Sequence, residues 1–307
     1  IILGKDIKGE VTAEIKNQPW DQAFQAILAT QGLSATEMTG GIIRVDAPAA
    51  LAALDSLEPS SRVKVFSYRR HYQFVVLMNS RRAPLRDPAI RRALNSGIDR
   101  PTWVRDAIGG RGTPSSGPIW PDHWAAPRNL QPIAYTPQRM APADRPLRLT
   151  CVVVEPTYER AAIALQRQLQ SLGVVLELQM PGAAEGVMRV EAGDFDLAFL
   201  EVISAPNLLR PYLFWSSKGP YNYGGYSSAT VDAALDAIRQ APDDDAYRAG
   251  VADLQRAILD DPPAIFLAWS ERARAVSTAF EVPTQQDRDP LTTLRLWRPA
   301  GDVISTE

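Results

Sequence analysis

The spacing of apolar residues in the first 46 positions predicts one small folded unit. Positions 10–15 alternate between polar and apolar residues, which predicts a strand. The next segment opens at Pro19 and places apolar side chains three and four positions apart, as on one face of a helix, and Gly32 ends this helix. Two further strands are predicted at 33–38 and 42–45, joined as a hairpin. Together these elements predict a βαββ module.

From residue 62 onward, continuous apolar runs alternate with amphipathic segments, which is typical of a larger α/β domain. A helix is predicted to start at Asp87-Pro88, to break and restart at Ile98-Asp99-Arg100, and to end at Gly109-Gly110. The strand 147–154, the helix that follows it and the strand 174–179 predict a β-α-β unit with parallel strands. The remaining strands are predicted at 62–67, 72–78, 195–200 and 264–269, and the remaining helices at 161–172, 230–239 and 245–259.

The composition is that of an ordinary soluble globular protein. The chain has 307 residues, of which 45% are hydrophobic and 22% charged, and its net charge is -2. A charge this close to zero does not favour nucleic acid or anionic lipid as a partner. No apolar run approaches the ~20 residues that a membrane-spanning helix needs. The single cysteine, Cys151, lies in an apolar run and is interpreted as a buried strand residue.

The titratable residues do not form a recognisable catalytic or metal-binding pattern. His71 and His123 are the only histidines, and no cysteine accompanies them, so neither a metal site nor a cofactor is predicted. The glycine-rich segment 109–112 follows a helix and is interpreted as a cap and loop, not as a phosphate cradle. The acidic run 243–245 is interpreted as a solvated helix start. We therefore expect no enzymatic activity.

Two stretches near the N-terminus carry a family resemblance. Residues 2–12, and then Asn17-Gln18-Pro19-Trp20-Asp21-Gln22-Ala23, resemble the short N-terminal domain shared by secretins and TonB-dependent receptors. The resemblance implies a non-catalytic module that makes protein–protein contacts in the periplasm. It places this module at residues 1–46, followed by a linker at 47–61.

A second series of motifs follows in the larger part of the chain. The motifs are Asn79, Pro84-Leu85-Arg86-Asp87, Ile90-Arg91-Arg92-Ala93-Leu94, Ile98-Asp99-Arg100, Gly193-Asp194-Phe195-Asp196 and Gly225-Tyr226-Ser227-Ser228. They resemble the family 5 extracellular solute-binding proteins, the oligopeptide, dipeptide and nickel-binding class of ABC importers. The resemblance implies that residues 62–300 form one α/β lobe of a periplasmic-binding-protein type II-like fold, with a tail at 301–307.

The chain departs from the family pattern in ways that bear on function. Full members have two lobes around a cleft, whereas the first lobe's sequence is missing here upstream of about residue 46, through loss or omission. Peptide binders of the family carry an aspartate in the loop after the Asp-Phe-Asp strand, which holds the peptide's amino terminus. Residues 201–207 have no aspartate, and Glu201 is the nearest acid. Glu201 is either a ligand anchor or an exposed or structural carboxylate.

The aromatic segment at residues 212–226 is the other candidate contact surface. It lines a ligand groove or anchors an interface in one interpretation, and in the other Phe214 and Tyr226 belong to the core. Arginine pairs at 69–70, 81–82 and 91–92 are interpreted as solvated faces, with an acidic partner surface as the alternative. The candidate ligand or partner contacts are Glu201, Asn207, Trp215, Tyr221, Tyr223 and Tyr226.

These observations lead to two functional hypotheses. The first is an extracytoplasmic, non-catalytic docking or scaffold subunit that binds protein partners in a larger envelope complex. The alternative is the substrate-binding component of a peptide or nickel ABC importer, with a peptide as ligand. Both predict a periplasmic or otherwise extracytoplasmic protein. Because the chain starts at Ile1 and not at Met, we expect a signal peptide or a membrane anchor in a missing N-terminal segment.

Overall fold

The computed structural model describes residues 2–3, 34–38, 42–46 and 62–300, without 130, 143, 205–206 and 285–287. The chain divides into two compact units. The larger unit consists of Ser67–Arg272 with 285–289, and the smaller unit consists of Ile1–Phe66, Ala273–Thr284 and Pro290–Glu307. The predicted division into residues 1–46, 47–61, 62–300 and 301–307 follows family resemblance and stays a prediction.

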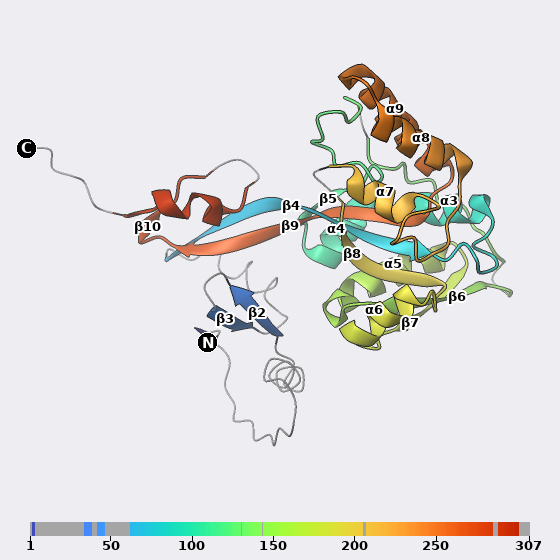
Figure 1. Ribbon diagram of the computed structural model, residues 1–307. Coiled ribbons are helices and arrows are strands. Elements are labelled where there is room, and N and C mark those ends of the chain that lie inside the picture. The colour runs from blue at the N-terminus through green and yellow to red at the C-terminus, as the bar shows by residue number, and fades with distance from the viewer. Residues whose placement is uncertain are drawn as a thin grey trace, which may run out of the picture. The chain divides into compact units, whose positions relative to one another are not determined.

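The first strands form a small sheet of their own. Strands β1 (Ile2–Leu3), β2 (Ser34–Met38) and β3 (Ile42–Asp46) lie in the order β1-β3-β2 (Figure 1). β2 and β3 pair antiparallel, from Ser34 opposite Asp46 to Met38 opposite Ile42, which confirms the predicted hairpin. β1 pairs parallel to β3. The predicted strand at 10–15 and the helix from Pro19 to Gly32 lie outside the described residues.

The smaller unit also contains C-terminal elements. Strand β10 (Phe280–Glu281) pairs antiparallel with β11 (Arg298–Pro299), and the 3-10 helix η2 (Pro290–Leu296) precedes β11. The Trp297 indole donates to the carbonyl of Pro290 and holds the end of η2. None of these elements was predicted, because they are short and carry little periodic signal.

A six-stranded mixed sheet organises the larger unit, with the order β5-β9-β4-β8-β6-β7. β6 pairs parallel to both β7 and β8, and β4 pairs antiparallel to β8. The parallel pairing of β6 and β7 confirms the predicted parallel strands of the β-α-β unit. The strands are β4 (Val63–Met78), β5 (Gly112–Pro114), β6 (Leu147–Val153), β7 (Val174–Gln179), β8 (Leu197–Ile203) and β9 (Ala264–Ser277).

One prediction about this sheet is wrong. The apolar runs at 62–67 and 72–78 were predicted as two strands, whereas the structure has the single 16-residue strand β4. The polar residues 68–71 interrupt the apolar pattern but not the strand, because β9 lies beside β4 in the sheet. β9 likewise continues past the predicted end at residue 269 to Ser277.

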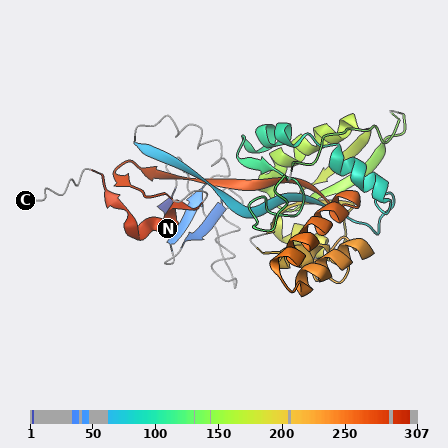
Figure 2. The ribbon, with the colours of Figure 1, turned by 90° about the horizontal axis from the view of Figure 1, so that it is seen from above.

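Helices cover both faces of the sheet (Figure 2). One core packs Phe74, Val76 and Met78 of β4 against α4 and α5, and the other packs Val75 and Leu77 of the same strand against α7, α8 and α9. This alternation explains why the end of β4 is a continuous apolar run. The helices are α3 (Pro88–Ser96), α4 (Arg100–Ile108), α5 (Glu159–Ser171), α6 (Ala183–Glu191), α7 (Leu209–Trp215), α8 (Ala229–Gln240) and α9 (Asp244–Asp260).

The predicted helix boundaries at α3 and α4 are confirmed by their caps. The Asp87 carboxylate accepts a hydrogen bond from Ala89 N at the start of α3, and the Asp99 carboxylate accepts one from Thr102 N at the start of α4. Gly109 ends α4 in the left-handed conformation with φ 63°. Cys151 is buried in the sheet as predicted, and burial raises the pKa of its thiol to about 12.

Candidate functional site

A group of polar side chains lies at the carboxyl ends of β6 and β8. These two strands are parallel, so their carboxyl ends meet at the same edge of the sheet. Glu155 lies two residues after the end of β6, and Tyr158 is the last residue of the 3-10 helix η1 (Pro156–Tyr158) that follows. Glu201 lies near the end of β8. Ligands in open α/β sheets bind preferentially at this edge.

The Glu201 carboxylate is held by two partners from distant parts of the chain. Its Oε2 atom accepts from Arg272 Nη2 at 3.2 Å and, more weakly, from the Tyr158 hydroxyl at 3.4 Å. The Glu201 side chain is only 6% exposed, whereas that of Arg272 is 33% exposed. The Oε1 atom is buried and has no hydrogen-bond partner in the described part of the chain. In the described part of the chain, therefore, only one of the two oxygens of this buried carboxylate accepts hydrogen bonds.

The strand pattern explains why this carboxylate is buried. Alternate residues of a strand share a face, so Glu201 points to the same side of the sheet as Phe199. Phe199 lies in the core, 5.8 Å from the ring of Tyr158 and 6.2 Å from that of Phe74. Glu201 also pairs with Phe74 across the sheet. Glu201 thus sits at the end of an apolar layer, where an anion needs a cationic partner.

The electrostatics of the group follow from this burial. The pKa of the Tyr158 hydroxyl is raised well above its ordinary value of 10, first by burial and then by the negative charges of Glu201 and Glu155. Tyr158 is therefore a neutral hydrogen-bond donor at neutral pH. Burial also raises the pKa of Glu155. Arg272 is the cation that opposes these acids.

Aromatic residues lie beside the end of β8. Ser204 N donates to the His71 carbonyl at 2.9 Å, so the segment after β8 begins next to His71. The His71 ring contacts Trp120 at 5.0 Å, and Trp120 contacts Trp269 at 4.9 Å, both edge to face. Burial lowers the pKa of His71, and Asp122 partly opposes that shift. Apolar rings and charged groups thus occur near the same edge of the sheet.

Two of the predicted contact residues are core residues, which corrects the exposed position expected for Trp215 and is one of the two interpretations left open for Tyr226. Trp215 and Tyr226 are each 2% exposed and pack in the core under α7, α8 and α9. The Tyr226 hydroxyl donates to the Asp261 carbonyl at 2.6 Å, and burial raises its pKa. Their size and amphipathic character made them candidates for an interface, but large aromatic side chains suit a core position equally well. Tyr226 has a buried polar partner there, whereas the buried Trp215 indole nitrogen has none among the described residues.

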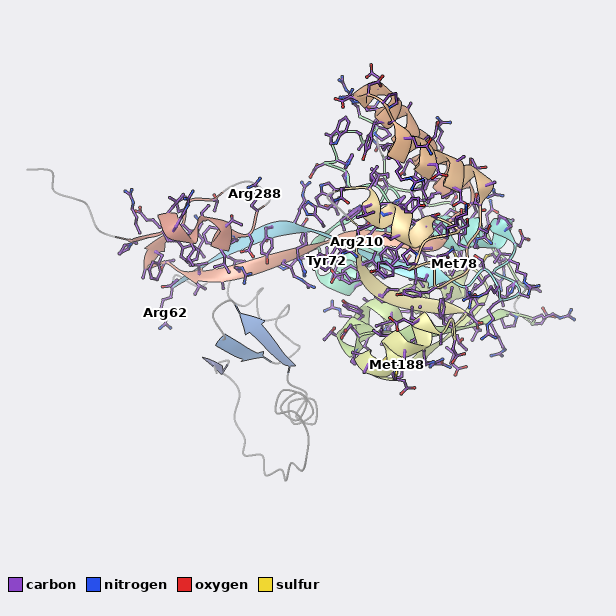
Figure 3. The ribbon with its side chains drawn as sticks, viewed as in Figure 1. Arg62, Tyr72, Met78, Met188, Arg210 and Arg288 are labelled. Carbon is purple, nitrogen blue, oxygen red and sulfur yellow. The ribbon has the colours of Figure 1, made fainter. Side chains whose placement is uncertain are left out.

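The other aromatic candidates do not lie with Glu201. Tyr221 and Tyr223 are half-buried, with ring centroids 6.1 Å apart. The Tyr223 carbonyl accepts from Arg81 Nη2 at 2.5 Å, so this segment lies beyond the Met78 end of β4. Glu201 pairs with Phe74 of the same strand, on the side of Tyr72, which Figure 3 shows inside the strand and away from Met78. A contact role for Tyr221 and Tyr223 stays a prediction.

Asn207 forms a hydrogen bond with a residue two positions away. It is exposed, and its Oδ1 atom accepts from Leu209 N at 3.1 Å just before α7. Its contact role also stays a prediction. The sequence reasoning missed Tyr158, Glu155 and Arg272. Glu155 directly follows a predicted strand, so the sequence could have indicated it as a candidate. Arg272 lies beyond the predicted end of its strand, so the sequence carried no such signal.

The described residues contain neither a metal-binding cluster nor a membrane-spanning helix. Among them, no group of three or more histidine, cysteine, aspartate or glutamate side chains is placed to hold a metal ion. In the same part of the chain, no helix combines the length and apolar character needed to cross a membrane.

Residues 24–224 match the bacterial extracellular solute-binding proteins, family 5 Middle. The chain belongs to this family. Residues 1–45 match the secretin and TonB N terminus short domain. Both resemblances found in the sequence are confirmed, and the fold is the mixed α/β, periplasmic-binding-protein type II-like fold that they imply. Members of family 5 are extracellular binding proteins, not enzymes.

Two relatives resemble this chain at low sequence identity. The probable D,D-dipeptide-binding periplasmic protein DdpA of Escherichia coli is 25% identical over 229 residues, which cover 70% of this chain and 44% of the relative. Protein XP55 of Streptomyces lividans is 26% identical over 290 residues, covering 85% of this chain and 52% of the relative. The chain thus spans about half the length of these two relatives.

Solved family 5 structures share the fold. The oligopeptide-binding protein AppA from Bacillus subtilis, in complex with a nonapeptide, superposes with a TM-score of 0.69 at 17% identity, covering 88% of this chain and 66% of AppA. NikZ from Campylobacter jejuni, in complex with Ni(L-His), gives a TM-score of 0.67 at 16% identity, covering 91% of this chain and 59% of NikZ. At these identities the likeness establishes the fold alone.

Proposed function

We propose that this chain acts in the periplasm as a substrate-binding component of a peptide-class ABC importer. The observation that carries the proposal is the family 5 match over residues 24–224. The larger unit would supply ligand-binding groups from the carboxyl ends of β6 and β8. A role without enzymatic activity follows from the same family membership.

The chemistry of that edge suits a peptide better than a bare metal ion. A peptide offers amide donors and acceptors, two charged ends and apolar side chains. The edge offers the Tyr158 hydroxyl, the Glu201–Arg272 pair and the apolar rings near His71. Arg272 is partly exposed, so its guanidinium can reach a ligand carboxylate while it stays close to Glu201. Glu201 is mostly buried, so it acts by holding Arg272 in place.

The docking or scaffold role is the second candidate. The match of residues 1–45 to the secretin and TonB short domain favours it, because the resemblance implies contacts with other proteins. The family match and the peptide-binding neighbours favour the importer component more strongly. An anchor in a segment upstream of Ile1 also stays a proposal.

Calorimetric titration of the full natural protein tests the importer proposal. The probes are the dipeptide Ala-Ala, a nonapeptide of mixed sequence and the Ni(L-His) complex. We expect a peptide to bind with a dissociation constant of about 1 μM, and Arg272→Met to weaken that binding about tenfold. The matched control is Arg148→Met, which removes an exposed arginine near the opposite, amino-terminal end of β6.

The outcomes separate the two candidates. Peptide binding that depends on Arg272 and not on Arg148 supports the importer component. If neither peptide binds at about 1 mM, the importer proposal is wrong. If, in that case, native mass spectrometry finds the protein in a stable complex that requires residues 1–45, the docking role takes its place.

A further inference from the structure

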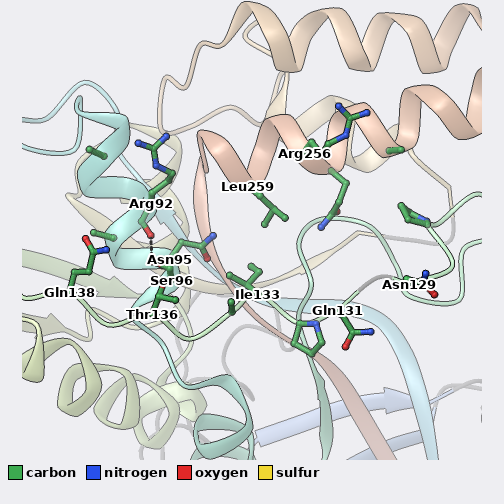
Figure 4. Close-up of a pocket in the computed structure, with 17 residues that line it drawn as sticks. Arg92, Asn95, Ser96, Asn129, Gln131, Ile133, Thr136, Gln138, Arg256 and Leu259 are labelled. Atoms are coloured by element: carbon green, nitrogen blue, oxygen red, sulfur yellow. Dashed lines mark hydrogen bonds between the residues drawn. The ribbon is translucent and has the colours of Figure 1, made fainter.

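A separate pocket opens between α3, α9 and the segment 127–138 (Figure 4). It has a volume of about 860 Å³, which lies in the range of small-molecule sites. All of its lining residues belong to the larger unit. α3 follows the Met78 end of β4, whereas Glu201 pairs with Phe74 inside that strand, and neither Glu201 nor Arg272 lines the pocket, so the pocket is distinct from the Glu201 group.

The amide of a mostly buried asparagine faces this pocket. Asn95 is 2% exposed, and its Oδ1 atom accepts from Arg100 Nη2 at 2.6 Å and from Phe266 N at 3.3 Å. Both partners are donors, so the oxygen must face them and the amide nitrogen must point the other way, toward the cavity (Figure 4). Within the described residues Asn95 Nδ2 has no hydrogen-bond acceptor. This nitrogen is reached from the pocket that Asn95 lines, so an acceptor on a ligand can bind it there in place of water.

Arg92 places a positive charge on the same helix face. Arg92 and Asn95 are three residues apart on α3, so their side chains are neighbours. Arg92 Nη1 donates to the Asp260 carbonyl at 2.8 Å, and no carboxylate of the described residues pairs with it. At the α9 side, Arg256 is paired with Asp253. None of the described residues that line the pocket is acidic, so its electrostatics favour an anion.

The rest of the lining sets the size and polarity of the ligand. Ile133 and Leu259 provide apolar surface, while Ser96 and Gln138 add polar groups. An anion with an apolar body and a carbonyl acceptor would satisfy Arg92, Asn95 and these apolar side chains together. Arginine binds a carboxylate with two parallel hydrogen bonds, which favours a carboxylate as the anion.

We propose that this pocket is a second ligand site, which binds a small N-acyl amino acid. The ligand's carboxylate pairs with Arg92, its acyl carbonyl accepts from Asn95 Nδ2, and its side chain packs on Ile133 and Leu259. The site does not depend on the proposed peptide-binding function, because it uses none of the residues at the ends of β6 and β8.

Titration with N-acetyl-L-leucine, followed by calorimetry and by NMR on the full protein, tests the proposal. We expect binding with a dissociation constant of about 1 mM, and about tenfold weaker binding of N-acetyl-L-leucinamide, which lacks the carboxylate. Arg92→Gln should also weaken binding of the acid about tenfold. Arg105→Gln, which changes an exposed arginine on α4 outside the pocket, should leave it unchanged.

A second variant removes the amide donor and adds a negative charge beside Arg92, while it keeps the acceptor that the core uses. Asn95→Asp keeps an oxygen for Arg100 and Phe266 but replaces the donor with a second, negatively charged acceptor. We expect this variant to fold and to lose measurable binding of the acid. The proposal is wrong if the amide binds as well as the acid, if Arg92→Gln and Asn95→Asp bind normally, or if Arg272→Met weakens binding instead. It is also wrong if the natural protein shows no binding at about 10 mM probe.

Discussion

The Glu201–Arg272 pair is expected to stabilise the larger unit measurably, and a double-mutant cycle measures by how much. The single variants are Arg272→Met, which removes the cation but keeps much of the apolar stem, and Glu201→Gln, which keeps the shape of the side chain but removes its charge. The double variant removes both charges. The coupling energy of the cycle reports the interaction between the two side chains.

The burial of the two partners sets the expected magnitude. Breaking a fully buried ion pair costs about 3–5 kcal/mol, because one charge is left without a partner. Arg272 is 33% exposed, so water screens part of the interaction, and exposed pairs contribute only about 0.2–1 kcal/mol. Without Arg272, Glu201 keeps, among the described residues, only the long bond from Tyr158 at 3.4 Å. We therefore expect Arg272→Met to lower the free energy of unfolding by about 2 kcal/mol, with a coupling energy of about 1–2 kcal/mol.

Urea unfolding of the full chain, followed by circular dichroism and tryptophan fluorescence, is the assay. Equal m-values across the four proteins would show that the same surface unfolds in each. Arg105→Met is the control, because Arg105 and Asp106 form an exposed pair, and its effect should stay within about 0.5 kcal/mol. A coupling energy below about 0.5 kcal/mol would refute the reasoning that the buried carboxylate depends on Arg272.

Three further changes test other parts of the structure. Phe199→Ala should lower the free energy of unfolding, measured in urea, by about 3–5 kcal/mol, because Phe199 is fully buried. A decrease below about 1 kcal/mol would contradict its place in the core. Asp99→Ala should lower the free energy of unfolding by about 1 kcal/mol, because it removes the acceptor that caps Thr102 N. Asp99→Asn keeps an acceptor and should lower that free energy by less. Equal decreases for the two variants would count against the cap. Burial lowers the pKa of His123 below its ordinary value of 6.5, so the folded state binds fewer protons than the unfolded state. The stability that neutral His123 contributes is therefore present above pH 6.5 and is lost as the pH falls below that value. His123→Asn, which can still accept from Ala125 N, should reduce the loss of melting temperature between about pH 7 and pH 5, and an unchanged loss would contradict this origin.

Local patterns along the chain determined much of the fold. The caps at Asp87 and Asp99 and the glycine at 109 fixed α3 and α4, because the side chains that end a helix are its immediate neighbours in sequence. The apolar runs at β6 and β7, with the helix between them, predicted parallel pairing. The short helices α6 and α7 were missed, since α6 contains Gly186 and α7 has only 7 residues.

The sequence by itself determined the family, the fold class and the burial of Cys151, because these follow from motifs and local periodicity. Only the tertiary structure decided which polar residues meet. Glu201 and Arg272 are 71 residues apart, and Asn95 and Phe266 are 171 apart, so no local spacing connects either pair. The structure also decided that Trp215 and Tyr226 are core residues, since an aromatic side chain serves equally well in a core or on an interface. The physical reason is the same in each case: burial and pairing depend on which strands and helices pack together, and that packing is a property of the whole fold.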